Sequence, residues 1–114
     1  MNEWGNETQV VAAIKRRLLE CWPGSWILKT AGGPYQEPGV PDLVVCVQGR
    51  FVALEVKHRK PGESDRHARG RATVQQAEQI RRIWKAGGVA DVVLTPDEAE
   101  QVVRVALNGQ EQGK

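Results

Sequence analysis

Two carboxylates and an ammonium group occur where the sequence otherwise has the apolar pattern of buried strands. They belong to Asp42, Glu55 and Lys57, within the stretch GVPDLVVCVQGRFVALEVK at residues 39–57. Burying an ionised carboxylate without a partner is costly, so a strand core retains one only when it is paired, protonated or bound to a metal. These three residues are therefore the first candidates for chemistry.

The apolar runs that carry these residues predict a β-hairpin. Residues 42–47 and 51–57 are strand-like, and the QGR connection between them is short enough for a turn with Gly49 in the left-handed conformation. Both runs are apolar on both faces, which indicates strands in the middle of a covered sheet.

This hairpin brings the three charged groups to one end of the sheet. Asp42 is expected opposite residue 56 or 57, while Glu55 and Lys57 share a strand face with about 7 Å between their Cα atoms. Two carboxylates with backbone carbonyls beside them suit a hard cation such as Mg²⁺ or Mn²⁺. A structural ion pair between Glu55 and Lys57 is the alternative.

The rest of the chain predicts an α/β fold. Apolar residues recur at helical spacing over residues 6–22, 73–86 and from Thr95 to about Leu107, and residues 25–31 and 89–95 are strand-like. The order α-β-β-β-α-β with a C-terminal helix indicates a mixed central sheet flanked by helices. We expect one domain over residues 1–108 and a polar C-terminal tail at residues 109–114.

Composition narrows the class of protein. The chain has 114 residues, a formal net charge of +2 and no apolar run long enough to cross a bilayer. Its first residues lack the features of a secretory signal, and its two cysteines lack the spacing of a zinc site. These features predict a cytoplasmic protein with no membrane contact.

Positive charge is concentrated immediately after the hairpin. Residues 57–71, KHRKPGESDRHARGR, contain six Lys or Arg, two His and only two acids. Such a segment is typical of a nucleic-acid contact or of a solvated loop. The candidate DNA-binding residues are Arg59, Lys60, Arg66, Arg69 and Arg71.

The combination of motifs resembles a known nuclease family. GVPDLVV followed by ALEVK resembles the PD-(D/E)xK nuclease superfamily, and GRATVQQAEQIRRIWKAGG followed by VADVV resembles its virus-type replication-repair nuclease (VRR-NUC) family. The chain looks like a small stand-alone member of phage type. The resemblance implies a restriction-endonuclease-like core in which Asp42, Glu55 and the Val56 carbonyl bind Mg²⁺ or Mn²⁺, with Lys57 as the catalytic lysine.

The resemblance also implies two further site residues on helices. Glu7 lies on the core-facing stripe of the first helix, where family members carry a glutamate that points at the metal; an acid favouring the helix dipole is the alternative. Gln76 shares a face with Ile80 and Ile83 and matches the family's glutamine beside the catalytic lysine. Gln75 replaces it if the helix is rotated.

The implied function is a metal-dependent DNA endonuclease that prefers branched substrates. Four-way (Holliday) junctions are the expected substrate, in the cytoplasm of a bacterial or phage-infected host cell. Because such a junction is two-fold symmetric, we expect a homodimer, with Trp4, Trp22 and Trp26 as interface candidates. The alternatives are a non-catalytic DNA-binding module and a nuclease subunit of a larger restriction or repair system.

Overall fold

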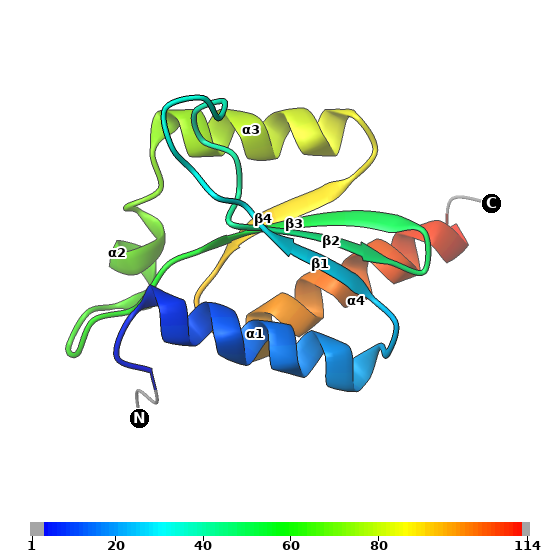
Figure 1. The fold of residues 1–114 in the computed structure, drawn as a ribbon, viewed down its shortest axis with the longest axis horizontal. Coiled ribbons are helices and arrows are strands. Elements are labelled where there is room, and N and C mark those ends of the chain that lie inside the picture. The colour runs from blue at the N-terminus through cyan, green and yellow to red at the C-terminus, as the bar shows by residue number, and fades with distance from the viewer. Residues whose placement is uncertain (1–3, 113–114) are drawn as a thin grey trace.

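The computed structural model describes residues 4–112, which fold into one mixed sheet with helices on both faces (Figure 1). In chain order the elements are α1 (Glu7–Cys21), β1 (Trp26–Lys29), β2 (Leu43–Val47), β3 (Arg50–Val56), α2 (Asp65–Arg69), α3 (Val74–Lys85), β4 (Val89–Val93) and α4 (Pro96–Gln112). Apart from α2, this is the predicted order, and the predicted fold class is confirmed. None of the helices in residues 4–112 is long and apolar enough to cross a membrane.

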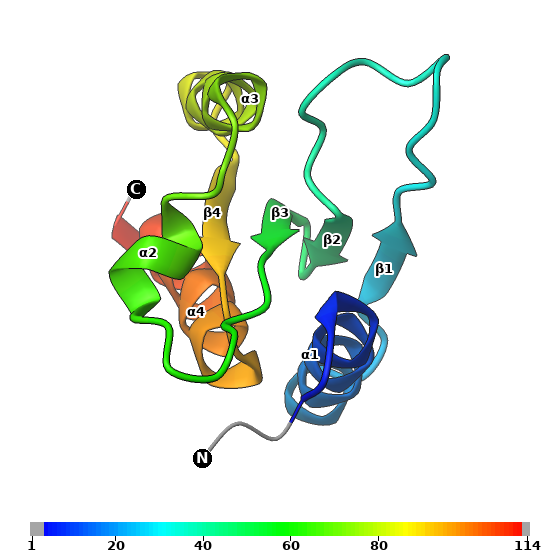
Figure 2. The same ribbon diagram turned by 90° about the vertical axis from the view of Figure 1, so that its left-hand side faces the viewer.

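The sheet has the strand order β1-β2-β3-β4. The first three strands are antiparallel neighbours, and β4 is parallel to β3. A parallel neighbour needs a crossover connection, which α2 and α3 supply. Figure 2 shows α3 on one face of the sheet, with α1 and α4 on the other.

The core lies between the sheet and the helix pair α1 and α4. Val10, Ile14 and Leu18 of α1 are buried at helical spacing, as the sequence pattern predicted. Each such side chain contributes about 1.5–3 kcal/mol by leaving water. The opposite sheet face is less covered, and Trp26 and Phe51 remain about half exposed there.

The hairpin turn differs from its prediction by one residue. Gln48 and Gly49 both have positive φ, at 51° and 81°, so the turn has two residues and β3 begins at Arg50. Two consecutive left-handed residues match the right-handed twist of the flanking strands. Leu43 therefore lies opposite Leu54 in the hairpin. Each residue of β2 faces a residue of β3 one or two positions before the predicted one.

Two helix predictions also need correction. The last helix continues to Gln112, because Gly109 costs only about 1 kcal/mol within a helix and does not end it; residues 113–114 of the predicted tail lie outside the described range. Within the predicted basic loop, five residues form α2, capped by the Ser64 side chain, which accepts the His67 N–H. A helix this short leaves no readable periodicity in the sequence.

Candidate active site at the end of the β2–β3 hairpin

Asp42 and Glu55 lie side by side at one end of the sheet. Asp42 immediately precedes β2, and the register that pairs Leu43 with Leu54 puts Asp42 opposite Glu55 rather than opposite residue 56 or 57. Directly opposed residues point to the same sheet face. The Asp42 carboxylate is fixed by the Val56 backbone N–H, which donates to Oδ2 at 2.8 Å.

Lys57 and Gln76 both contact Glu55. The Lys57 Nζ lies 3.5 Å from Glu55 Oε2, and its backbone N–H donates to the Val93 carbonyl at 3.0 Å, which fixes the chain as it leaves β3. Gln76 Nε2 donates to the same Glu55 oxygen at 3.0 Å. The structure therefore places Gln76 at the cluster, which decides between it and Gln75.

Glu55 is the buried charge of this cluster, with 3% of its surface exposed. Its second oxygen, Oε1, is buried and has no hydrogen-bond partner among the described residues. Burial, together with the charge of Asp42, raises the pKa of Glu55 to about 8, and the nearby Lys57 ammonium opposes this rise. When both acids are ionised, the site holds more negative charge than the Lys57 ammonium neutralises.

This donor set fits a hard divalent cation. The unpartnered Glu55 oxygen lies beside a second carboxylate, and oxygen ligands of this kind are preferred by Mg²⁺ and Mn²⁺. Within a strand, the N–H and C=O of one residue face the same neighbouring strand, so the Val56 carbonyl lies on the Asp42 side. Among residues 4–112, no group of three His, Cys, Asp or Glu side chains is assembled that could hold a metal.

Comparison with known proteins gives a match at the level of structure. No family profile matches the chain, and no curated protein matches its sequence. A solved "VRR_NUC domain" superposes with a TM-score of 0.60 and 23% identity, over 86% of this chain and 94% of its own. A solved "VRR_NUC domain protein" superposes with a TM-score of 0.64 and 20% identity, over 93% and 91%. The chain has the VRR-NUC fold.

Within this VRR-NUC fold, Glu7 does not lie where the stripe argument placed it. It is the first residue of α1 and is exposed, one turn before the buried Val10. The helix end itself is near the site, since His58 Nε2 is 2.7 Å from the Trp4 carbonyl oxygen. A role for Glu7 at the metal stays a prediction.

Three of the predicted DNA-binding arginines make contacts within the fold. Arg59 pairs with Asp65 at 3.3 Å. Arg69 donates to the Val92 carbonyl at 2.9 Å and pairs with Glu98, and Arg71 pairs with Glu63 at 3.3 Å and donates to the His58 carbonyl. The Arg69 contacts attach the basic segment to β4 and α4, whereas the Arg59 and Arg71 contacts lie within the segment. The remaining two, Lys60 and Arg66, are exposed and available to phosphate.

Thr30 is a site residue that the sequence did not reveal. Its backbone N–H donates to the Asp42 carbonyl at 2.9 Å, and its hydroxyl donates to the Pro41 carbonyl at 2.9 Å. It therefore holds the backbone on both sides of the Pro41–Asp42 bond. Only the strand register, which places Thr30 opposite Asp42, could have indicated this role.

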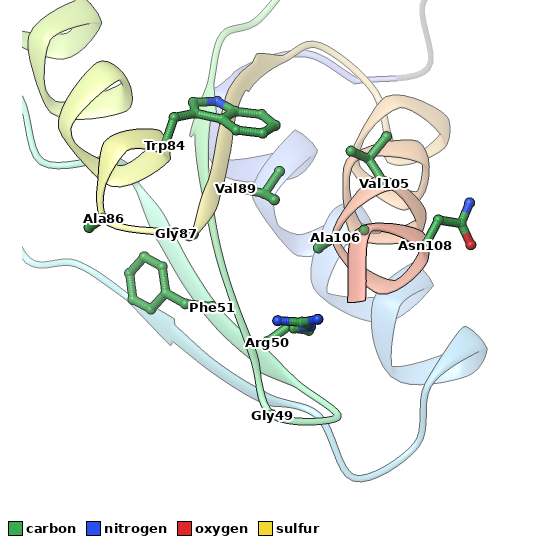
Figure 3. A pocket seen from close by; sticks show the side chains of 12 residues that line it. Gly49, Arg50, Phe51, Trp84, Ala86, Gly87, Val89, Val105, Ala106 and Asn108 are labelled. Carbon is green, nitrogen blue, oxygen red and sulfur yellow. The ribbon is translucent and has the colours of Figure 1, made fainter. Parts of the chain in front are cut away.

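A large groove on the described part of the chain lies away from the acid cluster. A groove of about 760 Å³ occupies the opposite end of β3, where the strand begins. Figure 3 shows Phe51, Trp84 and Val105 around it, contributed by β3, α3 and α4. Neither carboxylate of the cluster lines this groove, so the candidate active site and the groove are separate.

Proposed function

We propose that this chain is a divalent-metal-dependent endonuclease that hydrolyses phosphodiester bonds in DNA. The observation that carries the proposal is the buried Glu55, which has an unpartnered oxygen among the described residues and lies beside Asp42 and the Lys57 ammonium. A buried oxygen without a hydrogen-bond partner beside a second acid calls for a physical explanation, and a bound cation supplies one. The VRR-NUC fold supports this interpretation.

Asp42, Glu55 and the Val56 carbonyl would hold Mg²⁺ or Mn²⁺. A divalent cation bound there supplies charge neutralisation at the phosphate and activation of water for attack on phosphorus. Hydrogen bonds within the chain hold the two carboxylates in position. The Val56 N–H fixes one Asp42 oxygen and Gln76 fixes one Glu55 oxygen, which leaves the other oxygen of each acid for the cation.

Lys57 contributes a positively charged side chain to the acid cluster. Its ammonium lies 3.5 Å from the buried Glu55 carboxylate, and its side chain is 13% exposed. One of its three donors contacts Glu55, and the others can hold a water or a non-bridging phosphate oxygen. We propose that Lys57 holds the attacking water and stabilises the charge that develops on the phosphate.

The proposed substrate is branched DNA, with the four-way junction first. This preference follows from the similarity to the VRR-NUC family, and the basic segment beside the acid cluster supports contact with DNA. Lys60 and Arg66 are exposed on the segment that follows Lys57, where they can contact a phosphate backbone.

We further propose a homodimer that joins through the outer edge of β1. The outer edge of β4 is already occupied: Trp84 Nε1 donates to the Ala90 carbonyl at 2.7 Å, and Arg69 donates to the Val92 carbonyl at 2.9 Å. On β1, Thr30 bonds to β2, so by alternation the N–H and C=O of Ile27 and Lys29 point away from the sheet.

Two copies of β1 paired antiparallel would form one continuous sheet. The two-fold axis of such a pair is perpendicular to the sheet, so both acid clusters would lie on the same face, as cleavage of two strands of one junction requires. Of the three tryptophans expected at the interface, Trp4 and Trp22 pack partly buried against the core, whereas Trp26 on β1 is 56% exposed.

The interface can be tested without measuring activity. Lys29→Pro removes an outward N–H and leaves the bonds between β1 and β2 in place, and Lys29→Ala is the matched control. We expect light scattering to give a dimer for wild type and Lys29→Ala, and a monomer for Lys29→Pro. A monomeric wild type would overturn the dimer, and a dimeric Lys29→Pro would overturn this interface.

The activity is tested by single-turnover cleavage with Mg²⁺ on a labelled four-way junction, a flap and a linear duplex. Asp42→Asn and Glu55→Gln should abolish cleavage and keep the circular dichroism of wild type, because each removes metal-binding charge at nearly constant shape. Glu20→Gln, at an exposed acid of α1, should cleave normally.

The same assay separates the alternative functions. A folded wild type that binds but cleaves none of the three DNAs would favour the DNA-binding module. Activity gained only with an added partner would favour the subunit alternative.

A further inference from the structure

The segment that leads into Asp42 is attached along one side of α3. Arg82 Nη1 donates to Glu37 Oε1 at 3.1 Å, and Gln79 Nε2 donates to the Pro38 carbonyl at 3.2 Å. At the next residue, residue 39, a Cβ added to the glycine would lie 2.4 Å from the carbonyl carbon and oxygen of residue 75. Figure 1 shows this connection between β1 and β2 rising from the sheet to the level of α3.

These contacts follow a single stripe of the helix. Positions 75, 79 and 82 are separated by four and three residues, so they lie one above another on one helix face. Residues 37–39 therefore run alongside α3 in the opposite direction, and the closest approach is at the first turn of the helix. We call residues 37–39 and this stripe the loop–helix clamp.

The clamp connects the segment that precedes Asp42 with the first turn of α3, which carries Gln76. Asp42 follows Gly39 by three residues, and Gln76 belongs to the first turn of α3, where a Gly39 Cβ would lie 2.7 Å from its backbone nitrogen. The Gln76 side chain is held from both sides. Its Oε1 accepts the Thr73 N–H at 2.8 Å, and its Nε2 donates to Glu55 Oε2 at 3.0 Å.

We propose that the loop–helix clamp sets the position of Gln76 against Glu55, with Gly39 and Gln79 as positioning residues of the active site. Because the Thr73 N–H fixes the amide oxygen of Gln76, the amide nitrogen must face Glu55, and a shift of the helix turn moves this donor directly. Only glycine permits the approach, because any side chain at residue 39 would overlap the helix backbone. The effect on catalysis rests on the proposed nuclease function.

Gly32 offers a matched control for Gly39 in the same connection. Both residues have positive φ, +73° at Gly32 and +81° at Gly39, so alanine is strained at either position. A Cβ at Gly32 meets nothing within 4 Å, whereas a Cβ at Gly39 meets the backbone of α3. The difference between Gly32→Ala and Gly39→Ala therefore isolates the close approach from the backbone strain.

The first readout is independent of activity. In ¹H–¹⁵N spectra, the side-chain amide pair of Gln76 is assigned by its absence in Gln76→Ala. We expect Gly39→Ala to shift this pair and Gly32→Ala to leave it in place. Equal spectra for the two glycine variants would overturn the proposal, and this readout stands even if the wild type cleaves no DNA, in which case the nuclease function fails instead.

The second readout is the single-turnover cleavage rate. Loss of a residue that orients a metal ligand lowers activity by about 10- to 100-fold, and we expect a loss of this size for Gly39→Ala and no such loss for Gly32→Ala. In a Gln76→Ala background, Gly39→Ala should cause little further loss, because the residue through which it acts is already absent. Additive losses would overturn the coupling.

If Gly39→Ala does not fold, Gln79→Ala tests the clamp instead. Gln79 is partly exposed on the helix surface, so its replacement removes the bond to the Pro38 carbonyl without touching the core. We expect a smaller loss of cleavage than for Gly39→Ala and a shift of the Gln76 amide in the same direction. Arg81→Ala is the control, because Arg81 is an exposed residue of the same helix and is not three or four residues from any position of the stripe. An unchanged Gln76 amide in Gln79→Ala, or an equal shift in Arg81→Ala, would overturn the clamp.

Discussion

Raising the pH from 5 to 7 should destabilise the metal-free protein through a single residue, Glu55. Its pKa is raised to about 8 in the folded state, from an ordinary value of 4.5, because it is buried and lies beside Asp42. In the unfolded chain the carboxyl regains its ordinary pKa. The folded state therefore binds more protons than the unfolded state between these two values, and stability falls as pH rises.

The size of the effect follows from the two pKa values. Each pH unit within the window changes the free energy of unfolding by up to about 1.4 kcal/mol, which gives a loss of about 2.5 kcal/mol between pH 5 and 7. This is a large part of the stability of a small domain. The contribution of Glu55 is fully present below its unfolded pKa and is lost as the pH passes through its folded pKa.

Urea denaturation of wild type and Glu55→Gln at pH 5, 6, 7 and 8 measures this contribution. The glutamine has nearly the shape of glutamate and does not titrate, so the stability of Glu55→Gln relative to wild type should rise with pH. Other titrating groups are common to both proteins and cancel in the difference. Parallel pH profiles for the two proteins would show that Glu55 ionises normally, and would refute the argument from burial and from Asp42.

Adding Mg²⁺ should reverse the effect in wild type alone. A cation that binds the ionised carboxylates stabilises the folded state by mass action, and the gain should be larger at pH 8 than at pH 6, where Glu55 must first lose its proton. Glu55→Gln should gain little at either pH. A gain that is independent of pH and of Glu55 would place the cation at another site.

Further variants separate chemistry, binding and folding. Lys57→Ala should lower the single-turnover cleavage rate far more than the DNA affinity measured by gel shift, and equal losses would make Lys57 a phosphate contact instead. Arg66→Ala should reduce the magnitude of the slope of log K against log salt by about 0.9, the value for one neutralised phosphate. Arg69→Ala should instead lower the urea midpoint, because Arg69 bonds to the Val92 carbonyl and pairs with Glu98; an unchanged midpoint would assign Arg69 to DNA.

The hairpin that carries the cluster was predictable because its determinants are local. Asp42 and Glu55 are joined by one short turn, and a pattern of apolar strands with a Gly-containing connection is sufficient to bring them to one sheet end. The predicted register was wrong by one or two residues because Gln48, and not only Gly49, adopts a left-handed conformation. A positive φ at a residue other than glycine has no clear signature in a single sequence.

The contributions from the helices were less predictable, because they depend on packing between distant segments. Gln76 was expected at the site from its helix face, and the structure places it there, whereas Glu7 was expected on a buried stripe and is exposed. Periodicity identifies which face of a helix is apolar, but not whether every position on that face is covered by the rest of the fold. The internal contacts of the basic segment were missed for a similar reason, since Glu98, the acidic partner of Arg69, is 29 residues away in the chain.

The arrangement of the acid cluster connects stability to the proposed chemistry. A neutral residue at position 55 would relieve the repulsion from Asp42 and satisfy the core, and the fold alone would favour it. The chain instead retains an acid whose second oxygen has no partner among the described residues and whose ionisation the folded state resists. In the proposed nuclease, a divalent cation bound by the two acids would take the place of the missing partner and offset their repulsion, so the feature that weakens the metal-free fold would favour binding of the ion. We therefore expect Glu55 to be the residue at which stability and the proposed function conflict.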